Sequence, residues 1–395
     1  MISSIRIKNF KGIRSLDLSA LGPLHILVGP NSSGKSTFLD AIEFVRSCLE
    51  SGPLKAVEER VPEFRDLTYM RKGGPIEIEL WLDLSASLPR QKDLLRYRVA
   101  IVDDEQLGVK VQDEALERQP RTKAKARRLV GKTLIPGYFY LREDGRHQDV
   151  FDFGLDKLAL SLTPPDQSRY PTANAVKSFL MRGIRYMQLN SRAMRDPCPA
   201  TRSTDLELDG TNLARVVGRL IRSANGNHPA SQLSGHADAL EDWTDHLKYA
   251  LDDLEKIGWA ARAPDNAEYI ILKYAGGLEC PSWLLSDGTL RMLALTLPAF
   301  LPASPRIYMV EEPENGVHPK ALEIILKALA AIPEAQVFIA THSPLVVQEE
   351  GVDVLLCFTR DDQGVHAVPG NKHPALQDWK GVPDLATIFS SRVLG

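Results

Sequence analysis

Residues 29–37 read GPNSSGKST, and this stretch decides how the rest of the chain is interpreted. The apolar segment Leu24–Val28 before it has the pattern of a buried strand, and Thr37–Leu49 after it carries apolar residues at helical spacing. The stretch fits the pattern G-x-x-x-x-G-K-[ST], in which strand, loop and helix follow in that order. Backbone N–H groups of such a loop and the positive end of its helix bind phosphate. The sequence therefore predicts a nucleotide-binding loop.

Two side chains of this phosphate loop carry specific chemistry. Lys35 is expected to reach the β and γ phosphates, and the Ser36 hydroxyl is expected to ligate Mg²⁺. The predicted cofactors are therefore ATP and Mg²⁺. A glycine-rich turn that binds nothing is the alternative, and the preceding strand argues against it. The other predicted ATP contacts in the loop are Pro30, Asn31, Ser32, Ser33, Gly34 and Thr37.

Three further blocks follow far downstream in the chain. They are LLSDGT at 284–289, IYMVEEPENGVHP at 307–319 and ATHSP at 340–344. The second block ends an apolar strand pattern with Glu311 and Glu312, and the third follows another buried-strand pattern at 337–340. With the phosphate loop, these blocks describe a split nucleotide site to which both ends of the chain contribute.

The bulk composition is that of an ordinary globular protein with a sizeable core. The chain has 395 residues, of which 44% are hydrophobic and 25% charged, and its net charge of −3 argues against a generally basic nucleic-acid coat. Its four cysteines are scattered without a C-x-x-C pair, so neither a disulfide framework nor a zinc site is predicted. The sequence contains no signal peptide and no membrane-length apolar run. We therefore expect a cytoplasmic protein without a membrane partner.

The order of expected elements indicates a nucleotide-binding core of the α/β class interrupted by a long insertion. Residues 1–60 are assigned to the first half of the core and 276–395 to the second, which alternates strands and helices in the manner of a parallel sheet. Residues 61–275 are assigned to the insertion, a β meander followed by a helical part. The meander strands are expected at 76–84, 97–102, 109–111 and 138–141, and a helix at 212–223.

A seven-residue repeat marks the end of the insertion. Leu233, Leu240, Leu247 and Leu254 recur at heptad spacing, and Ile257 occupies a companion position. The spacing predicts a core-facing helix over 233–257, with a short coiled-coil contact as the alternative.

The motif blocks resemble those of the ABC-class ATPases of the SMC, RecF and OLD type. The opening IRIKNFKGIRSLDL is similar to the first two strands of that family, and LSDGT resembles its signature loop, usually Leu-Ser-Gly-Gly-Gln. In that family the signature of one subunit closes over the γ-phosphate held by another. The resemblance implies that Ser286, Asp287 and Gly288 contact the nucleotide of a partner subunit, in a homodimer or a larger even-numbered oligomer.

The same resemblance assigns roles to the downstream acids and histidine. Glu311 would hold Mg²⁺, Glu312 would orient or deprotonate the attacking water, and His342 would bind the γ-phosphate. Together with Lys35, Glu312 and His342 are the predicted catalytic residues. Asn315 and His318 occupy the place of the family's D-loop, with interface and turn roles both open. The family's Q-loop glutamine has no clear counterpart, although Gln91 is available.

The middle section offers two weaker signals. The stretches at 184–200 and 208–217 are similar to stand-alone AAA-type ATPases related to OLD proteins, which implies fold but no activity. A basic run at 118–128 contains no acidic residue and suits either phosphate contacts or a solvated loop. Its predicted nucleic-acid contacts are Arg121, Lys123, Lys125, Arg127 and Arg128.

The leading functional hypothesis is an ATP-hydrolysing switch or motor that dimerises on nucleotide and acts on DNA or gates a separate effector. No acidic D-x-D cluster follows His342, so a nuclease would have to be another chain. The resemblance makes bacterial antiphage defence a reasonable expectation. The alternatives are a RecF-like DNA-repair ATPase and a scaffold that binds ATP without turnover. The long insertion and the Glu-Glu pair argue against a transporter subunit.

Overall fold

The computed structural model describes most of the chain. It covers residues 1–376 apart from 86, 89–92, 121–124, 133–137, 143–146, 152–153, 155, 225–235, 264, 305 and 350, and beyond 376 it covers Thr387. Within this part of the chain, no helix combines the length and the apolar character needed to cross a bilayer.

A six-stranded sheet lies at the centre of the molecule, with strand order β10-β14-β15-β3-β16-β17. The first five strands are parallel, and the last pair is an antiparallel hairpin. The strands are β3 (Leu24–Val28), β10 (Ile184–Met187), β14 (Arg306–Glu311), β15 (Ala335–Ala340), β16 (Leu355–Asp361) and β17 (Gly364–Pro369). The alternation of strand and helix in the C-terminal part thus gives the expected parallel sheet.

An antiparallel sheet of eight strands forms the second layer, in the order β2-β1-β4-β5-β6-β7-β8-β9. Its strands are β1 (Ile2–Phe10), β2 (Ile13–Ser19), β4 (Ile76–Leu82), β5 (Leu94–Asp104), β6 (Gly108–Gln119), β7 (Arg127–Lys132), β8 (Tyr138–Leu141) and β9 (Gln148–Phe151). Every meander strand expected from the sequence is present. Strands β5 and β6 are longer than the apolar pattern indicated.

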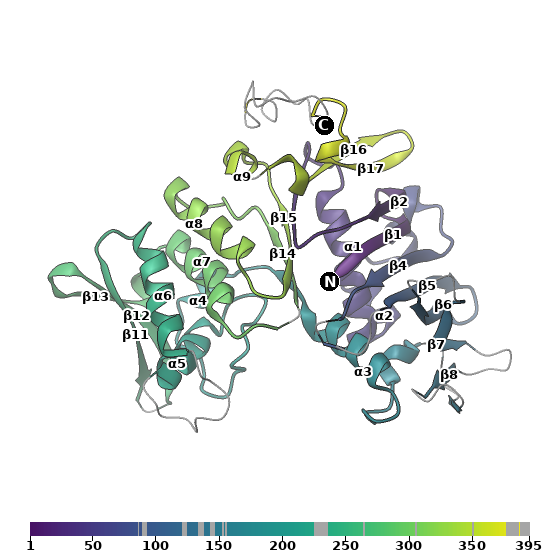
Figure 1. Cartoon of the computed structure of the whole chain (residues 1–395), viewed down its shortest axis with the longest axis horizontal. Helices are drawn as coiled ribbons and strands as arrows, with labels where there is room; N and C mark the ends of the chain where they lie inside the picture. Colours follow the sequence, from purple (N-terminus) through teal and green to yellow (C-terminus); the bar gives the residue numbers. More distant parts are fainter. Residues whose placement is uncertain are drawn as a thin grey trace.

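Helices separate and cover these sheets (Figure 1). The lobe that contains the antiparallel sheet holds α1 (Lys35–Ser51), α2 (Pro53–Glu58) and α3 (Pro171–Ser178). The other lobe holds α4 (Ser191–Met194), α5 (Leu213–Ala224), α6 (His236–Lys248), α7 (Asp287–Thr296) and α8 (Pro319–Ala330). It also carries a third sheet of β11 (Leu254–Arg262), β12 (Ala267–Tyr274) and β13 (Leu278–Pro281), whereas α9 (Pro344–Glu349) lies near β16.

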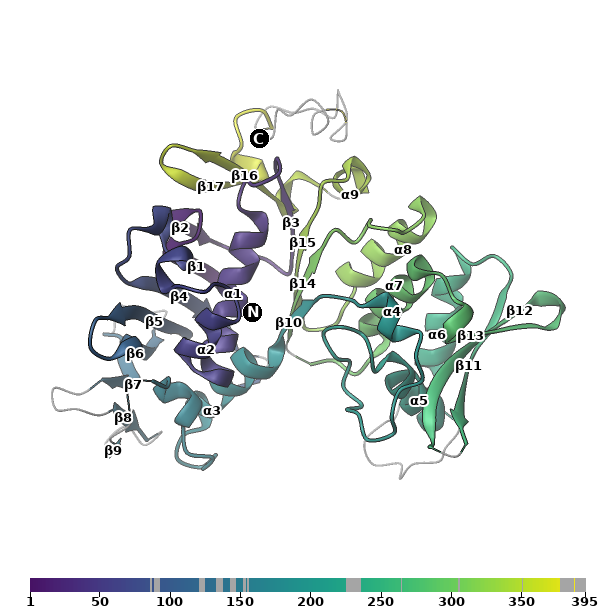
Figure 2. The ribbon, with the colours of Figure 1, turned by 180° about the vertical axis from the view of Figure 1, so that it is seen from behind.

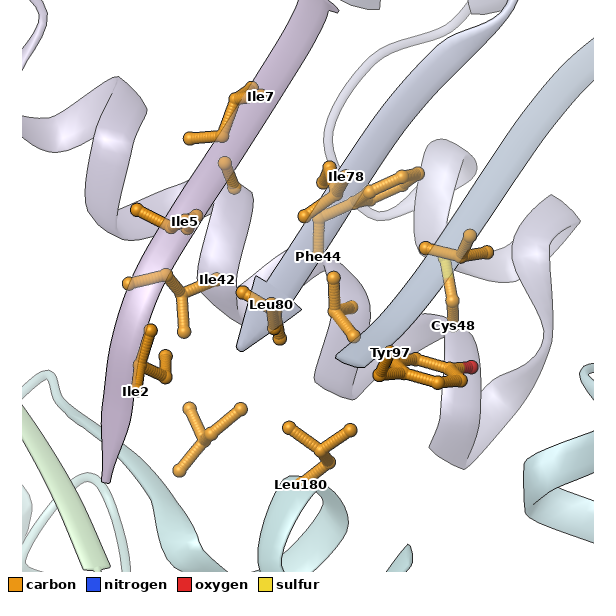
Figure 3. Close-up of a cluster of buried hydrophobic side chains, with 14 of the residues drawn as sticks. Ile2, Ile5, Ile7, Ile42, Phe44, Cys48, Ile78, Leu80, Tyr97 and Leu180 are labelled. Carbon is orange, nitrogen blue, oxygen red and sulfur yellow. The ribbon is translucent and has the colours of Figure 1, made fainter. Parts of the chain in front are cut away.

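Two hydrophobic cores lie on opposite faces of the central sheet. Ile307 and Met309 of β14 belong to the core shared with α1 and the antiparallel sheet, whereas Tyr308 and Val310 belong to the core shared with α7 and α8. This alternation follows from the two-residue repeat of a strand. Figure 3 shows the first core, in which Ile5 of β1 and Phe44 of α1 lie among side chains from β4 and β5. Burial on both faces explains why the central strands are almost wholly apolar.

The predicted helix over 233–257 is wrong at its C-terminal end. Helix α6 stops at Lys248, and Leu254 and Ile257 lie on β11; Leu233 lies outside the described residues. A register shift between Leu254 and Lys256 lets both Leu254 and Ile257 enter the same core, although they are three residues apart. The irregular strand β11 therefore places apolar residues at a spacing that is also typical of a helix.

The middle section contributes to both large sheets. Strand β4 pairs with β1 in the antiparallel sheet, and β10 pairs with β14 at the edge of the central sheet. Figure 2 shows β10, β14, β15 and β3 side by side between the two lobes. The three-part division of the chain remains a prediction, and these pairings show that residues 61–275 complete the core on both sides.

Candidate functional site

The phosphate loop connects β3 to α1, and two glycines set its shape. Gly29 has φ +146° and Gly34 has φ +107°, conformations that side chains rarely adopt. A Cβ at Gly29 would collide with the carbonyl oxygen of Phe358, and a Cβ at Gly34 would collide with Val365. Both contacts come from the hairpin β16–β17, which therefore packs directly against the loop. Because the phosphate loop lies so close to this hairpin, only glycine fits at positions 29 and 34.

Lys35 occupies the first position of α1 and is buried, with 5% of its surface exposed. Its ammonium donates hydrogen bonds to the carbonyl oxygens of Gly29 at 2.9 Å and Pro30 at 3.0 Å. Burial lowers the pKa of Lys35 to about 8, while the nearby Glu311, Glu312 and Glu314 act to raise it. Among the described residues Lys35 forms no ion pair, so its charge is available to a bound anion.

Parallel strands bring the remaining motifs to the same edge. Strands β3, β14 and β15 end in neighbouring positions, so the loops that follow them converge. A cleft of about 500 Å³ lies at this edge. Its lining includes the predicted site residues Asn31, Ser32, Ser33, Gly34, Lys35, Ser36, Thr37, Glu312 and His342, together with Gly12, Arg360 and Val365. Pro30 lines an adjoining cleft with Asn31, Ser32, Ser33, Tyr69, Met70 and Arg360.

The two adjacent glutamates have different surroundings. Glu311 ends β14, and its Oε1 accepts a hydrogen bond of 2.7 Å from the Tyr186 hydroxyl. Burial and the neighbouring Glu311 raise the pKa of Tyr186, so the phenol remains a donor. Glu312 has a left-handed backbone with φ +45°, and its Oε2 accepts a hydrogen bond of 2.7 Å from Asn315. A strained, non-glycine backbone at this position is common where a side chain must be aimed into a site.

His342 follows β15 and is held through its backbone. Oε1 of Glu314 accepts hydrogen bonds from the N–H of His342 at 3.0 Å and from the Thr341 hydroxyl at 2.7 Å. Burial and the nearby Lys35 lower the pKa of His342, although neighbouring glutamates act in the other direction. The imidazole therefore favours its neutral form at the edge of the cleft.

The signature residues lie outside this cleft. Ser286 caps α7, and its Oγ accepts a hydrogen bond of 3.1 Å from the N–H of Thr289. Asp287 forms an ion pair of 2.6 Å with Arg195, which also donates to the Leu285 carbonyl. A Cβ on Gly288 would contact the carbonyl oxygen of Gly316, so this loop packs on the turn after the glutamates. Helix α7 lies in the lobe opposite α1 (Figures 1 and 2).

Sequence reasoning missed three groups at the site. Tyr186 and Gln188 come from the strand β10 and its exit, and Glu314 is the third glutamate of the EEPE stretch. Met187 pairs with Val310, and Gln188 and Glu311 are the residues that follow this pair, whereas Gln91 lies outside the described residues. The only signal for Gln188 and Tyr186 was the likeness of the stretch at 184–200 to other ATPases. His318 serves as the N-cap of α8, because its Nδ1 accepts a hydrogen bond from the N–H of Lys320.

The basic run is a strand pair and not one continuous loop. Arg118 lies on β6 and bonds to Thr172, whereas Arg127 and Arg128 lie on β7, where Arg128 pairs with Glu117 at 3.3 Å. Glu117 also pairs with Arg96. Arg121 and Lys123 lie outside the described residues, and Lys125 is exposed. Nucleic-acid contact by this run therefore remains a prediction, and Arg128 would have to leave its ion pair with Glu117 to take part.

Two families of ATPase domain match the chain. Residues 1–125 match a family described as "AAA ATPase domain", and residues 177–348 match one described as "AAA domain, putative AbiEii toxin, Type IV TA system". An ATP/GTP phosphatase of Helicobacter pylori is 20% identical over 92% of this chain and 94% of its own length.

Two other relatives match only short segments. An uncharacterized protein of Methanocaldococcus jannaschii is 46% identical over 13% of this chain and 23% of its own length. The OLD nuclease of Thermus scotoductus is 47% identical over 11% of this chain and 8% of its own length. The chain thus spans less than a quarter of either of these two relatives.

Solved structures support the same fold. An SMC head bound to the C-terminal winged-helix domain of ScpA has a TM-score of 0.55 and 16% identity, covering 93% of this chain and 96% of that one. The SMC head of Pyrococcus furiosus has a TM-score of 0.51 and 14% identity, covering 93% and 95%. These matches show that the chain has the α/β fold of an SMC head. Two stretches on that fold, one of which contains the phosphate loop and the other the acidic strand end, match ATPase-domain families.

Proposed function

We propose that the chain hydrolyses ATP with the help of Mg²⁺ in a dimer whose signature loops complete the phosphate loops of the opposite subunits. One observation carries this proposal. Lys35, Glu312 and His342 line one cleft, whereas Ser286 caps helix α7 and is not among the residues that line this cleft. In this proposal the cleft supplies the groups for phosphate binding and water activation, and the signature loop of a second subunit closes it.

The residues at the cleft suit a nucleotide phosphate. The hydroxyl of Ser33 is buried without a hydrogen-bond partner among the described residues, and Lys35 has no ion-pair partner there. Gly29 and Gly34 leave space that a Cβ would fill. A buried hydroxyl without a partner is costly unless a bound group satisfies it, and a buried ammonium without a counter-ion favours a bound anion. They would bind the β and γ phosphates.

The acidic groups suit a magnesium ion at the same edge. Ser36 follows Lys35 on α1, and Glu311 offers carboxylate oxygens, which Mg²⁺ prefers. Gln188 and Glu311 each follow the last residue pair of β10 and β14, and Gln188 is the candidate for the glutamine that sequence reasoning left unassigned. Bound Mg²⁺ would neutralise charge on the β and γ phosphates. In this assignment Ser36, Glu311 and Gln188 hold the ion directly or through water.

Glu312 and His342 carry the remaining steps. Glu312 accepts a hydrogen bond at Oε2, so its other oxygen can orient the attacking water and take its proton. His342 lines the same cleft and would donate a hydrogen bond to the γ-phosphate. Both side chains are exposed in this conformation, so closure by a partner subunit would also exclude water.

We also propose that the closed dimer gates a separate effector in bacterial defence against phage. The support is associational: a matching family is described as a possible toxin of a toxin–antitoxin system, and one relative is an OLD nuclease. Purifying the protein with its neighbouring gene products, with and without ATP, tests this part. Isolation of the ATPase alone in both conditions would contradict it.

Glu312→Gln tests the catalytic proposal. The amide cannot accept the water's proton, so hydrolysis should fall by about two orders of magnitude or more, while ATP binding persists. The ATP-bound dimer should then accumulate, as measured by light scattering after size-exclusion chromatography. Glu323→Gln, on the exposed face of α8, is the matched control and should behave as wild type. Wild-type turnover by Glu312→Gln would show that another group activates water.

A further inference from the structure

Tyr186 lies at the site but outside the four motif blocks of the sequence. It lies on β10, the edge strand of the central sheet, and its hydroxyl donates a hydrogen bond of 2.7 Å to Oε1 of Glu311. We propose that Tyr186 is a positioning residue that orients the Glu311 carboxylate for a divalent cation. This inference rests on the proposed function, in which Glu311 is a metal ligand.

The strand register explains why a tyrosine can reach this carboxylate. Tyr186 pairs with Met309, so Glu311 lies two residues further along the neighbouring parallel strand, a rise of about 7 Å. The phenol ring is long enough to extend over that distance, whereas a serine or threonine hydroxyl is not. Met309 belongs to the core on the α1 side, and Tyr186 packs against that same core. Tyr186, Glu311 and the start of α1 therefore share one face of the sheet.

The backbone that carries Tyr186 is held firmly on both sides of the residue. Strand β10 pairs along its whole length with β14. Beyond it, the N–H of Gln188 donates to the Leu208 carbonyl at 2.9 Å, and the N–H of Asn190 donates to the Asp209 carbonyl at 2.9 Å. A fixed strand gives the phenol a defined position, and a defined donor fixes the plane of the carboxylate.

A phenol is well suited to this task because it is neutral. One oxygen of Glu311 accepts the hydrogen bond from the tyrosine hydroxyl, and the other oxygen, which has no hydrogen bond among the described residues, can bind the cation. An arginine or lysine at this place would bind the carboxylate more strongly and would also cancel the negative charge that attracts Mg²⁺. The nearby cation, Lys35, instead bonds to loop carbonyls. The arrangement therefore orients Glu311 and preserves its charge.

Tyr186→Phe removes the donor and keeps the ring, so the packing of β10 is preserved. We expect the affinity for Mn²⁺, measured by electron paramagnetic resonance in the presence of a non-hydrolysable ATP analogue, to fall about tenfold, the effect typical of a lost partner of a metal ligand. The Mg²⁺ concentration for half-maximal ATPase activity should rise by a similar factor. Affinity for the analogue without metal should stay at the wild-type value. Tyr274→Phe, on β12 in another sheet, is the matched control.

Two comparisons separate the possible failures. Wild-type Mn²⁺ affinity in Tyr186→Phe overturns the inference when Glu311→Gln loses Mn²⁺ binding. Wild-type Mn²⁺ affinity in both variants instead overturns the metal-ligand role of Glu311 in the proposed function, and the inference with it. A lower thermal midpoint of Tyr186→Phe with unchanged metal affinity would assign Tyr186 to folding alone and would also overturn the inference.

Discussion

Three glutamates within four positions have different partners, although the sequence presents them as one acidic stretch. Glu311 accepts from Tyr186, Glu312 accepts from Asn315, and Glu314 accepts from the backbone of His342. The three partners differ because Glu312 has a left-handed backbone, which turns the chain so that the side chains of this stretch reach different neighbours. The sequence predicted Glu311 and Glu312 as site residues, and nothing local marked Glu314.

Glu314→Ala should impair turnover more than nucleotide binding. The backbone N–H of His342 and the Thr341 hydroxyl would both lose their acceptor, at a cost of about 1–3 kcal/mol each for an unsatisfied group. Since His342 is proposed to contact the γ-phosphate during hydrolysis, kcat should fall roughly tenfold or more, with KM for ATP changed much less. Steady-state phosphate release measures both constants.

Glu314→Gln is the informative companion, because its amide oxygen can still accept both hydrogen bonds. It should recover most of the activity lost in Glu314→Ala. Equal losses in the two variants would mean that the charge of Glu314 matters and that its acceptor role toward His342 does not.

At the scale of elements, a buried carboxylate joins the antiparallel sheet to the segment that leads out of it. Glu114 of β6 is fully buried and accepts hydrogen bonds from the N–H groups of Ala159 and Leu160, at 2.6 and 2.9 Å, and from the Tyr97 hydroxyl at 2.8 Å. Burial raises the pKa of Glu114 to about 7, and the hydrogen bonds oppose that shift. This carboxylate fixes where the chain turns back toward α3.

Glu114 should make stability depend on pH in a defined direction. Its folded-state pKa lies above the ordinary value of 4.5, so the folded state binds the proton more tightly. Its contribution to stability is therefore greatest below pH 4.5 and is lost as pH rises to about 7. The difference between these two pKa values, at about 1.4 kcal/mol per pKa unit, sets an upper limit of about 3.5 kcal/mol. Glu114→Gln cannot titrate and also turns an N–H group toward N–H donors.

The measurement is the thermal midpoint of the wild type and of Glu114→Gln at pH 5 and pH 7.5. Wild type should be more stable than the variant at both, with the larger advantage at pH 5. Titrations elsewhere affect both proteins and cancel in the difference. An advantage that grows toward pH 7.5 would reverse the assigned direction of the pKa shift.

The elements themselves were largely predictable, because strand alternation and helical spacing are local properties. Strands β3, β14 and β15 and helices α1 and α5 lie where the sequence indicated. The exception is the stretch 249–257, where the bulge that places Leu254 and Ile257 in one core exists only because β12 pairs beside it. Local spacing alone cannot distinguish such a strand from a helix.

At the scale of the whole molecule, the separation of Lys35 from Ser286 predicts complementation between subunits. Lys35→Ala and Ser286→Arg should each abolish hydrolysis when pure, because every site in such a dimer carries one defect. After subunit exchange, half of the dimers are mixed, and each mixed dimer contains one intact site. Activity should return to about one quarter of the wild-type value by this counting, provided that one intact site suffices.

The complementation experiment is read from ATPase rates of the separate and mixed variants. Mixing Lys35→Ala with the double variant Lys35→Ala, Ser286→Arg is the control, because no intact site can form. If the mixture of single variants stays inactive although light scattering detects mixed dimers, the phosphate loop and the signature act within one subunit.

The sequence by itself determined the motif blocks and the local structures that carry them. Glycine at 29 and 34, lysine at 35 and the acids after an apolar strand are legible because loop conformation and strand burial depend on neighbouring residues. Only the tertiary structure decided which residues from distant parts of the sequence contact these motif residues. Tyr186 meets Glu311 across 125 positions because β10 lies beside β14. Strand order sets such contacts, and no local pattern encodes strand order.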